Sequence, residues 1–264
     1  MTTPALASRD SVTMLRRNLL HMRRYPSLTV LTIGQPVVLL LLFVYVFGGT
    51  MGAGLSGGGG RAAYLAYITP AILMITVSSL AAGTAISVAT DMTGGIIARL
   101  RTMAVSRAAV LGAHVLNSMI QTVAALAAVM VVALLLGMRS PADPTGWLTA
   151  AGLLVLVAFA LTWLTVALGL ASSSVEAASN TPMFLIFLPF LGSGFVPVES
   201  LPAGLRWFAE YQPFTPIMDT LRALLAGTPV GSDGRLAVGW CVVIAGASYV
   251  WARRLFDRNK PRIS

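Results

Sequence analysis

Residues 148–171 read LTAAGLLVLVAFALTWLTVALGLA and contain no charged side chain. A helix needs roughly 20 apolar residues to cross the hydrocarbon of a bilayer, and this stretch meets that length. The rest of the chain has the same character, because 56% of its 264 residues are hydrophobic and only 10% are charged. Soluble domains carry about 25% charged residues. The stretch therefore predicts one membrane-spanning helix of an all-α, polytopic membrane protein.

Similar apolar runs occur along the chain and predict six transmembrane helices within residues 28–251 of a single membrane domain, 1–264. The predicted spans are 28–47, 65–89, 110–136, 148–171, 183–198 and 236–251. The fifth run is short and contains Pro189, Gly192 and Gly194, which favours a bent or incomplete crossing. Residues 252–264 form a basic tail.

The charge distribution predicts the orientation of these spans. Arg and Lys are retained in the cytoplasm during insertion, so the basic segments mark the inner side. With the N-terminus inside, the inner segments carry the whole net charge of +9, and the outer segments hold equal numbers of basic and acidic residues. We therefore expect a multi-pass protein of the plasma (inner) membrane with both termini cytoplasmic.

The first 27 residues combine an apolar stripe with a basic face. Val12, Leu15, Leu19 and Met22 recur at helical spacing, while arginines fill the positions between them. This pattern is typical of a helix lying on the inner leaflet against anionic lipids, and a solvated basic tail is the alternative. The same distribution favours membrane lipids over nucleic acid as the partner of the positive charge.

The segments predicted outside the membrane differ in pattern. Residues 48–61 are rich in Gly, which favours a flexible connector. Residues 201–208 and 216–226 predict two short amphipathic helices, the second with Thr215 as N-cap and Gly227 as its stop. Asp219 and Arg222 lie three residues apart, so they can pair on one face of that helix.

The sequence offers no catalytic or metal-binding set. A phosphate-binding loop needs a lysine after its glycines, and the only lysine is Lys260, near the C-terminus. Cys241 is the only cysteine, so a cysteine metal cluster is excluded. His114 has no carboxylate neighbour in sequence and is interpreted as a helix-end or packing histidine rather than a proton carrier. We expect neither enzymatic activity nor a resident cofactor in this chain.

The most informative segment lies between the second and third predicted spans and reads GGIIARLRTMAVSR over residues 94–107. Together with Asp91, it resembles the cytoplasmic coupling helix of ABC-2 type exporter permeases, especially those grouped with the daunorubicin and doxorubicin resistance permeases. The matching residues are Asp91, Gly95, Arg99, Leu100, Arg101, Val105, Ser106 and Arg107. Ala98 and Ala104 depart from that pattern, in which an acidic residue and a proline are common.

This resemblance implies that ATP and Mg are used by a separate ABC ATPase chain, present in two copies, and that a second permease, identical or paralogous, completes the assembly. It also implies that the coupling segment contacts the ATPase and passes its motion to the adjoining spans. Leu100 and Met103 would be the apolar anchors. The residues expected to couple the two chains are Asp91, Gly95, Arg99, Leu100, Arg101, Met103 and Arg107.

A second set of motifs supports the same resemblance near the C-terminus. The order is Phe195-Val196-Pro197, Leu201-Pro202, Gln212-Pro213-Phe214-Thr215-Pro216, and then Asp219 with Leu221-Arg222. Each motif is short, but together with the six-span plan they extend the resemblance over nearly the whole chain. It implies that the chain is the permease of an ATP-driven exporter of a drug, lipid or other amphiphile.

Polar side chains within the apolar runs are candidates for a substrate path, because a polar group facing lipid without a partner is costly. These residues are Gln35, Asn117, Gln121 and Thr122. Hydrogen bonding between helices explains them equally well. Two other functions stay open: export of a polysaccharide or glycolipid, and ion-coupled secondary transport. The second would call for a carboxylate near the middle of a span, where the sequence has none.

Overall fold

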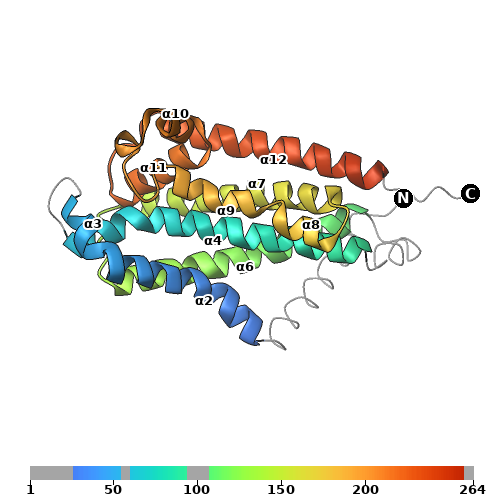
Figure 1. The fold of residues 1–264 in the computed structure, drawn as a ribbon, viewed down its shortest axis with the longest axis horizontal. Coiled ribbons are helices and arrows are strands. Elements are labelled where there is room, and N and C mark those ends of the chain that lie inside the picture. Colours follow the sequence, from blue (N-terminus) through green and yellow to red (C-terminus); the bar gives the residue numbers. More distant parts are fainter. Residues whose placement is uncertain (1–25, 55–59, 94–106, 259–264) are drawn as a thin grey trace, which may run out of the picture.

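A computed structural model describes residues 26–54, 60–93 and 107–258 of the chain. Long helices lie side by side along one axis and form a bundle (Figure 1). Its principal helices are α2 (Pro26–Leu42), α4 (Gly60–Thr93), α6 (Arg107–Leu135), α7 (Pro144–Ala171) and α12 (Asp233–Arg258). The described ranges contain no strand, so the predicted all-α class is confirmed.

Five helical segments are long and apolar enough to cross a membrane. They are Gly34–Gly54, Gly60–Thr93, Leu111–Leu135, Pro144–Ala171 and Asp233–Phe256, and each contains most or all of a predicted span. The predicted interfacial helix, residues 1–27, lies outside the described residues up to Tyr25, and α2 begins at Pro26. We call the end of the bundle where α4 stops the Asp91 end, and the end where α7 begins the Asp143 end.

The prediction for the glycine-rich connector after the first span was partly wrong. The chain stays helical through the π-helical turn η1 (Phe43–Phe47) and then α3 (Gly48–Gly54). A Cβ on Gly52 would collide with the carbonyl oxygen of Gly60, at the start of α4. The absence of a side chain on Gly52 therefore allows α3 to pack closely against the start of α4, in addition to the conformational freedom that glycine gives the backbone.

The predicted fifth span, 183–198, is interrupted rather than one continuous helix, as its Pro and Gly residues had indicated. The apolar segment begins earlier and consists of α8 (Val175–Asn180), α9 (Met183–Phe187) and the 3-10 helix η2 (Leu188–Leu191). Pro189 lies within this segment and cannot donate a backbone hydrogen bond, which breaks regular α-helix. All three pieces pack along α4, so the segment follows the bundle without forming a single long helix.

Two short helices lie at the Asp143 end, as predicted: α10 (Ala203–Tyr211) and α11 (Phe214–Leu225). The expected start of the second helix was wrong, because Pro213 occupies the N-cap position and Thr215 lies inside the helix. Its end was predicted correctly. Gly227 has a φ of +64°, and the amide of Thr228 donates to the carbonyl of Ala223, which closes the helix in a Schellman motif.

Asp143 caps the start of α7. Its carboxylate accepts hydrogen bonds from the Thr145 hydroxyl and the Gly146 amide, at 2.6 and 2.8 Å. These bonds, led by the one from Thr145, lower the pKa of the Asp143 carboxyl. The cap satisfies one backbone amide that the first helical turn leaves free.

The core of the bundle is the contact between α4 and α7, with α6 and α12 on the flanks of α7. Small residues allow the closest approach: a Cβ built on Gly169 of α7 would lie 2.6 Å from the carbonyl oxygen of Ala85 in α4. Close backbone packing through small residues is the usual way for helices to associate in a membrane.

We expect Gly169→Val to destabilise the bundle, whereas Gly152→Val on the same helix leaves it nearly unchanged. A Cβ on Gly152 meets nothing within 4 Å, so the two substitutions share their effect on helix propensity and differ in packing. Overpacking of this kind costs about 1–3 kcal/mol. Thermal midpoints of the two variants in detergent, read by size-exclusion chromatography after heating, test this, and equal midpoints would contradict it.

Candidate functional site

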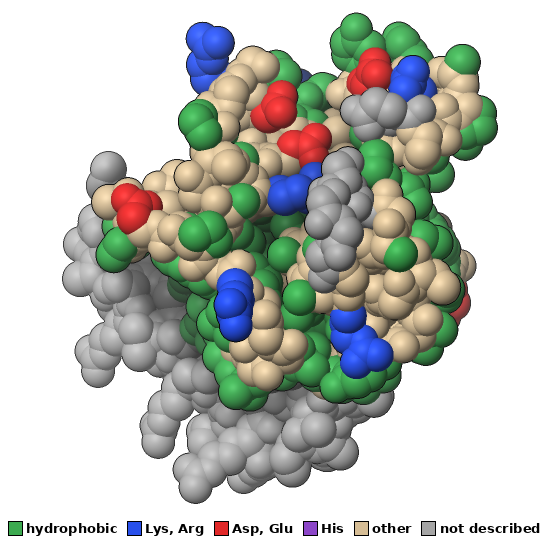
Figure 2. Space-filling view, turned by 90° about the vertical axis from the view of Figure 1, so that its left-hand side faces the viewer, with side chains coloured by type: hydrophobic (Ala, Val, Ile, Leu, Met, Phe, Trp, Pro, Cys, Tyr) green, Lys and Arg blue, Asp and Glu red, His purple; other side chains and the backbone are tan. Residues whose placement is uncertain are grey.

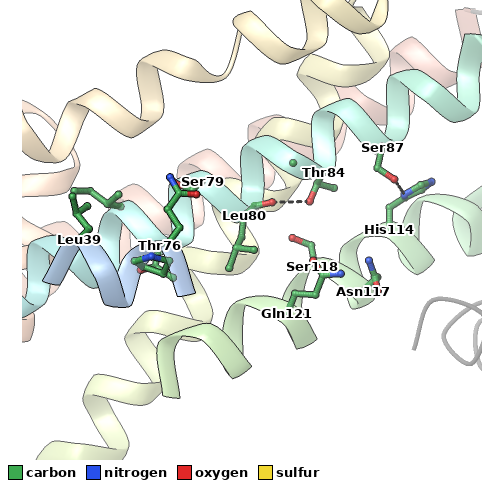
Figure 3. Close-up of a pocket in the computed structure, with 14 residues that line it drawn as sticks. Leu39, Thr76, Ser79, Leu80, Thr84, Ser87, His114, Asn117, Ser118 and Gln121 are labelled. Atoms are coloured by element: carbon green, nitrogen blue, oxygen red, sulfur yellow. Dashed lines mark hydrogen bonds between the residues drawn. The ribbon is translucent and has the colours of Figure 1, made fainter. Parts of the chain in front are cut away.

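A pocket of about 470 Å³ lies between α2, α4 and α6 (Figure 3). Its volume falls within the range of about 300–1,000 Å³ that is usual for small-molecule sites. The lining is rich in amide and hydroxyl groups and comprises Gln35, Pro36, Leu39, Ile75, Thr76, Ser79, Leu80, Gly83, Thr84, Ser87, His114, Asn117, Ser118 and Gln121.

Helical spacing explains why these residues share one space. In α4, Ser79, Gly83 and Ser87 recur every four residues, so they lie on one face of the helix. In α6, Asn117 and Gln121 have the same spacing and project from the facing helix (Figure 3). The pocket extends from about the middle of α4 toward the Asp91 end.

Three of the four residues predicted for a substrate path line this pocket. Gln35 comes from α2, and Asn117 and Gln121 come from α6, although the two helices are separated by α4 in the chain. Thr122 is buried, with 1% of its surface exposed, and does not line the pocket. That these residues contact a substrate stays a prediction, but the structure places three of them at one cavity.

His114 has a carboxylate partner that the sequence reasoning missed. Its Nε2 lies 3.1 Å from a carboxylate oxygen of Asp91, and its Nδ1 lies 3.4 Å from the Ser87 hydroxyl. Asp91 is 23 residues away in the chain, near the end of α4, so adjacency in sequence could not reveal the contact. Aligning the second and third spans as an antiparallel pair would have brought the two residues together.

The predicted ATPase-coupling residues fall mostly outside the described residues. Gly95, Arg99, Leu100, Arg101 and Met103 all lie there, and of Arg107 only the backbone, as the first residue of α6, is described. Asp91 is described and holds His114. The structure therefore defines the two helix ends that flank the predicted coupling segment.

A second polar cluster joins three elements at the Asp143 end. Arg222 of α11 pairs with Asp219, as the sequence predicted, and its guanidinium lies 4.1 Å from the centre of the Tyr67 ring in α4. Ser193, which follows η2, donates to Asp219 at 2.7 Å and accepts from Arg222 and the Tyr67 hydroxyl, both at 2.9 Å, through its carbonyl. This Arg222 cluster ties the broken fifth segment to α4 and α11.

The Asp143 end also carries side chains of both charges, which Figure 2 shows on the face that it views. Within the described ranges, no group of three or more His, Cys, Asp or Glu side chains could hold a metal ion. The candidate binding site of the described residues is the amide- and hydroxyl-lined pocket.

Comparison with known proteins identifies the family of this chain. The chain is 28% identical over 228 residues to a daunorubicin resistance ABC transporter permease protein, DrrB1, of Streptomyces coeruleorubidus. The match covers 85% of this chain and 78% of the relative. The sequence profile of the ABC-2 type transporter family matches residues 10–226, which is most of the chain and includes every residue that lines the pocket. The chain therefore belongs to the ABC-2 type transporter family.

Proposed function

We propose that this chain is the permease subunit of an ATP-driven exporter that moves a drug, lipid or other amphiphile outward across the plasma membrane. The observation that carries the proposal is the polar pocket between the apolar helices α2, α4 and α6 of an ABC-2 family member. The name of its relative, a drug-resistance permease, supports an amphiphilic cargo.

The proposed topology has six crossings, with Val175–Leu191 as a broken fifth, and places both termini and the Asp91 end in the cytoplasm. Arg253 and Arg254 support this orientation, because they are exposed near the end of α12 that lies at the Asp91 end. The pocket would then occupy the half of the membrane nearer the cytoplasm.

In this proposal, force comes from an ABC ATPase chain, two copies of which bind ATP and Mg and act on a pair of permeases, identical or paralogous. Residues 94–106 would contact the ATPase. The Asp91–His114 contact holds the end of α4 beside the start of α6. A displacement of the segment between them would therefore move two walls of the pocket together.

Two alternatives differ from this proposal, one in the cargo and the other in the energy source. A polysaccharide or glycolipid exporter would use the same architecture, and the hydroxyl-rich lining suits sugars as well. An ion-coupled transporter needs an ionisable group near the middle of a span. Asp91, the carboxylate that contacts the lining residue His114, lies at a helix end and is paired, which favours the ATP-driven mechanism.

The test is reconstitution of the permease with the ABC ATPase chain that co-purifies with it from its native membrane. We expect the permease to stimulate ATP hydrolysis and to drive ATP-dependent movement of amphiphilic probes in vesicles. An ATPase subunit that cannot hydrolyse ATP is the control. Uphill transport by the permease alone on an ion gradient, with no effect of the ATPase, would contradict the proposal.

A further inference from the structure

Three carboxamides, together with the Ser79 hydroxyl, supply the free hydrogen-bonding capacity of the pocket among the described residues. In the part of the chain that the structure describes, the side chains of Gln35, Asn117 and Gln121 have no hydrogen-bond partner. Each amide offers one acceptor oxygen and two donor hydrogens. The three groups are therefore available to a molecule in the pocket.

Several hydroxyls of the lining are already used. Thr76 and Thr84 donate to backbone carbonyls one turn earlier in α4, at 2.7 and 3.3 Å. Ser118 lies 3.3 Å from the hydroxyl of Thr162 in α7, so this contact holds two helices together. The hydroxyls of Thr76, Thr84 and Ser118 are therefore engaged within the protein, whereas the three amides and the Ser79 hydroxyl are available to a ligand.

The lining carries no fixed charge. None of the residues that line the pocket is Asp, Glu, Lys or Arg, and His114 is the one histidine among them. Its ring is held between Asp91 and Ser87, so the nearest carboxylate is already paired. A charged group seated here would lose its hydration without gaining a counter-charge, which is strongly unfavourable.

Apolar side chains accompany the amides on the helices that form the pocket. Val38 of α2 and Leu116 and Ile120 of α6 are exposed and lie next to or near the amide positions in sequence. In a membrane such side chains face lipid, and an alkyl tail beside them has the same apolar surroundings as a lipid tail. A polar head in the pocket can thus be combined with a tail among the lipids.

Building on the proposed export function, we infer that this pocket binds the uncharged, hydrogen-bonding head group of an amphiphile that enters from the inner leaflet. Gln35, Asn117 and Gln121 determine the specificity. Carbonyl, hydroxyl and glycosidic groups match the donors and acceptors of the three amides, whereas an ammonium or carboxylate group finds no partner.

Binding to the permease alone, in lipid nanodiscs, tests this. Three fluorescent probes share one alkyl tail and carry a glucoside, a trimethylammonium or a sulfate head, and empty nanodiscs give the background. We expect the glucoside to bind at least ten-fold more tightly than either charged probe. The double variant Asn117→Ala with Gln121→Ala should remove that preference, whereas Asn180→Ala, an exposed amide on α8 outside the pocket, should keep it.

A second variant keeps the test informative if the double variant folds poorly. Gln121→Glu places a carboxylate in the pocket with little change of shape, so the preference should move toward the trimethylammonium probe by about ten-fold. Equal binding of the three probes by the natural protein, or an unchanged preference in Gln121→Glu, would overturn the inference. The binding test contains no ATPase, so its result does not depend on the proposed export function. If binding is selective here but the permease fails to stimulate the ATPase in the separate reconstitution, the exporter is refuted and the binding site stands.

Discussion

Replacing Leu100 and Met103 together by Asp is expected to reduce ATP-dependent transport to background while membrane insertion stays normal. Both residues lie in the proposed coupling segment, between α4 and α6. Hot-spot residues at the centre of a protein interface contribute about 2 kcal/mol or more each, and we expect both residues to belong to that class. Two carboxylates buried in their place would weaken the contact with the ATPase, so the motion of the ATPase would no longer reach the permease.

Three measurements on the same membranes examine this prediction: probe efflux, stimulation of ATP hydrolysis, and the amount of folded permease. Thr102→Asp is the matched control, because it adds a carboxylate to the same segment without removing an apolar anchor. Transport that survives in the Leu100 and Met103 double variant would refute the coupling role of the segment. A loss of transport in Thr102→Asp as well would point to charge rather than to the anchors.

Arg222→Ala is expected to destabilise the Asp143 end by about 2 kcal/mol, because it removes several charged hydrogen bonds and leaves Asp219 without its counter-charge. Both side chains are partly exposed, which keeps the cost below that of a fully buried pair. Since the Arg222 cluster fastens the broken fifth segment to α4, we expect that segment to lose its packing against α4 at a lower temperature than the rest of the bundle unfolds.

Thermal midpoints and hydrogen exchange of the segment around Ser193 measure this effect. Arg235→Ala removes an exposed arginine at the start of α12 and serves as the control. Asp219→Asn separates the two contributions, since it can still accept from Ser193 but loses the charge. If Arg222→Ala were as stable as Arg235→Ala, the cluster would not hold the fifth segment.

Local patterns in the sequence were enough to predict much of the fold. Hydropathy depends only on the residues within one run, so five of the predicted spans correspond to long helices. Gly227 was identified as a stop because a left-handed residue is needed there. The pairing of Asp219 with Arg222 followed from their spacing on one helix.

Patterns within one run were insufficient where neighbouring elements decide the structure. The helical course of Gly48–Gly54 depends on packing against Gly60, which no pattern within those residues reveals. The partner of His114 lies on another helix, and so does the ring that faces Arg222. A single run contains no information on the rotation of one helix against the next.

The sequence by itself determined that this protein is an all-helical membrane protein, which residues are polar within its apolar runs, and which family it resembles. Only the tertiary structure decided that Gln35 meets Asn117 and Gln121 in one pocket, and that Asp91 holds His114 at its edge. The physical reason is the range of the interactions. The free energy of transferring a helix from water into lipid is a sum over the residues of that helix. A binding pocket, in contrast, exists only where side chains of separate helices face one another.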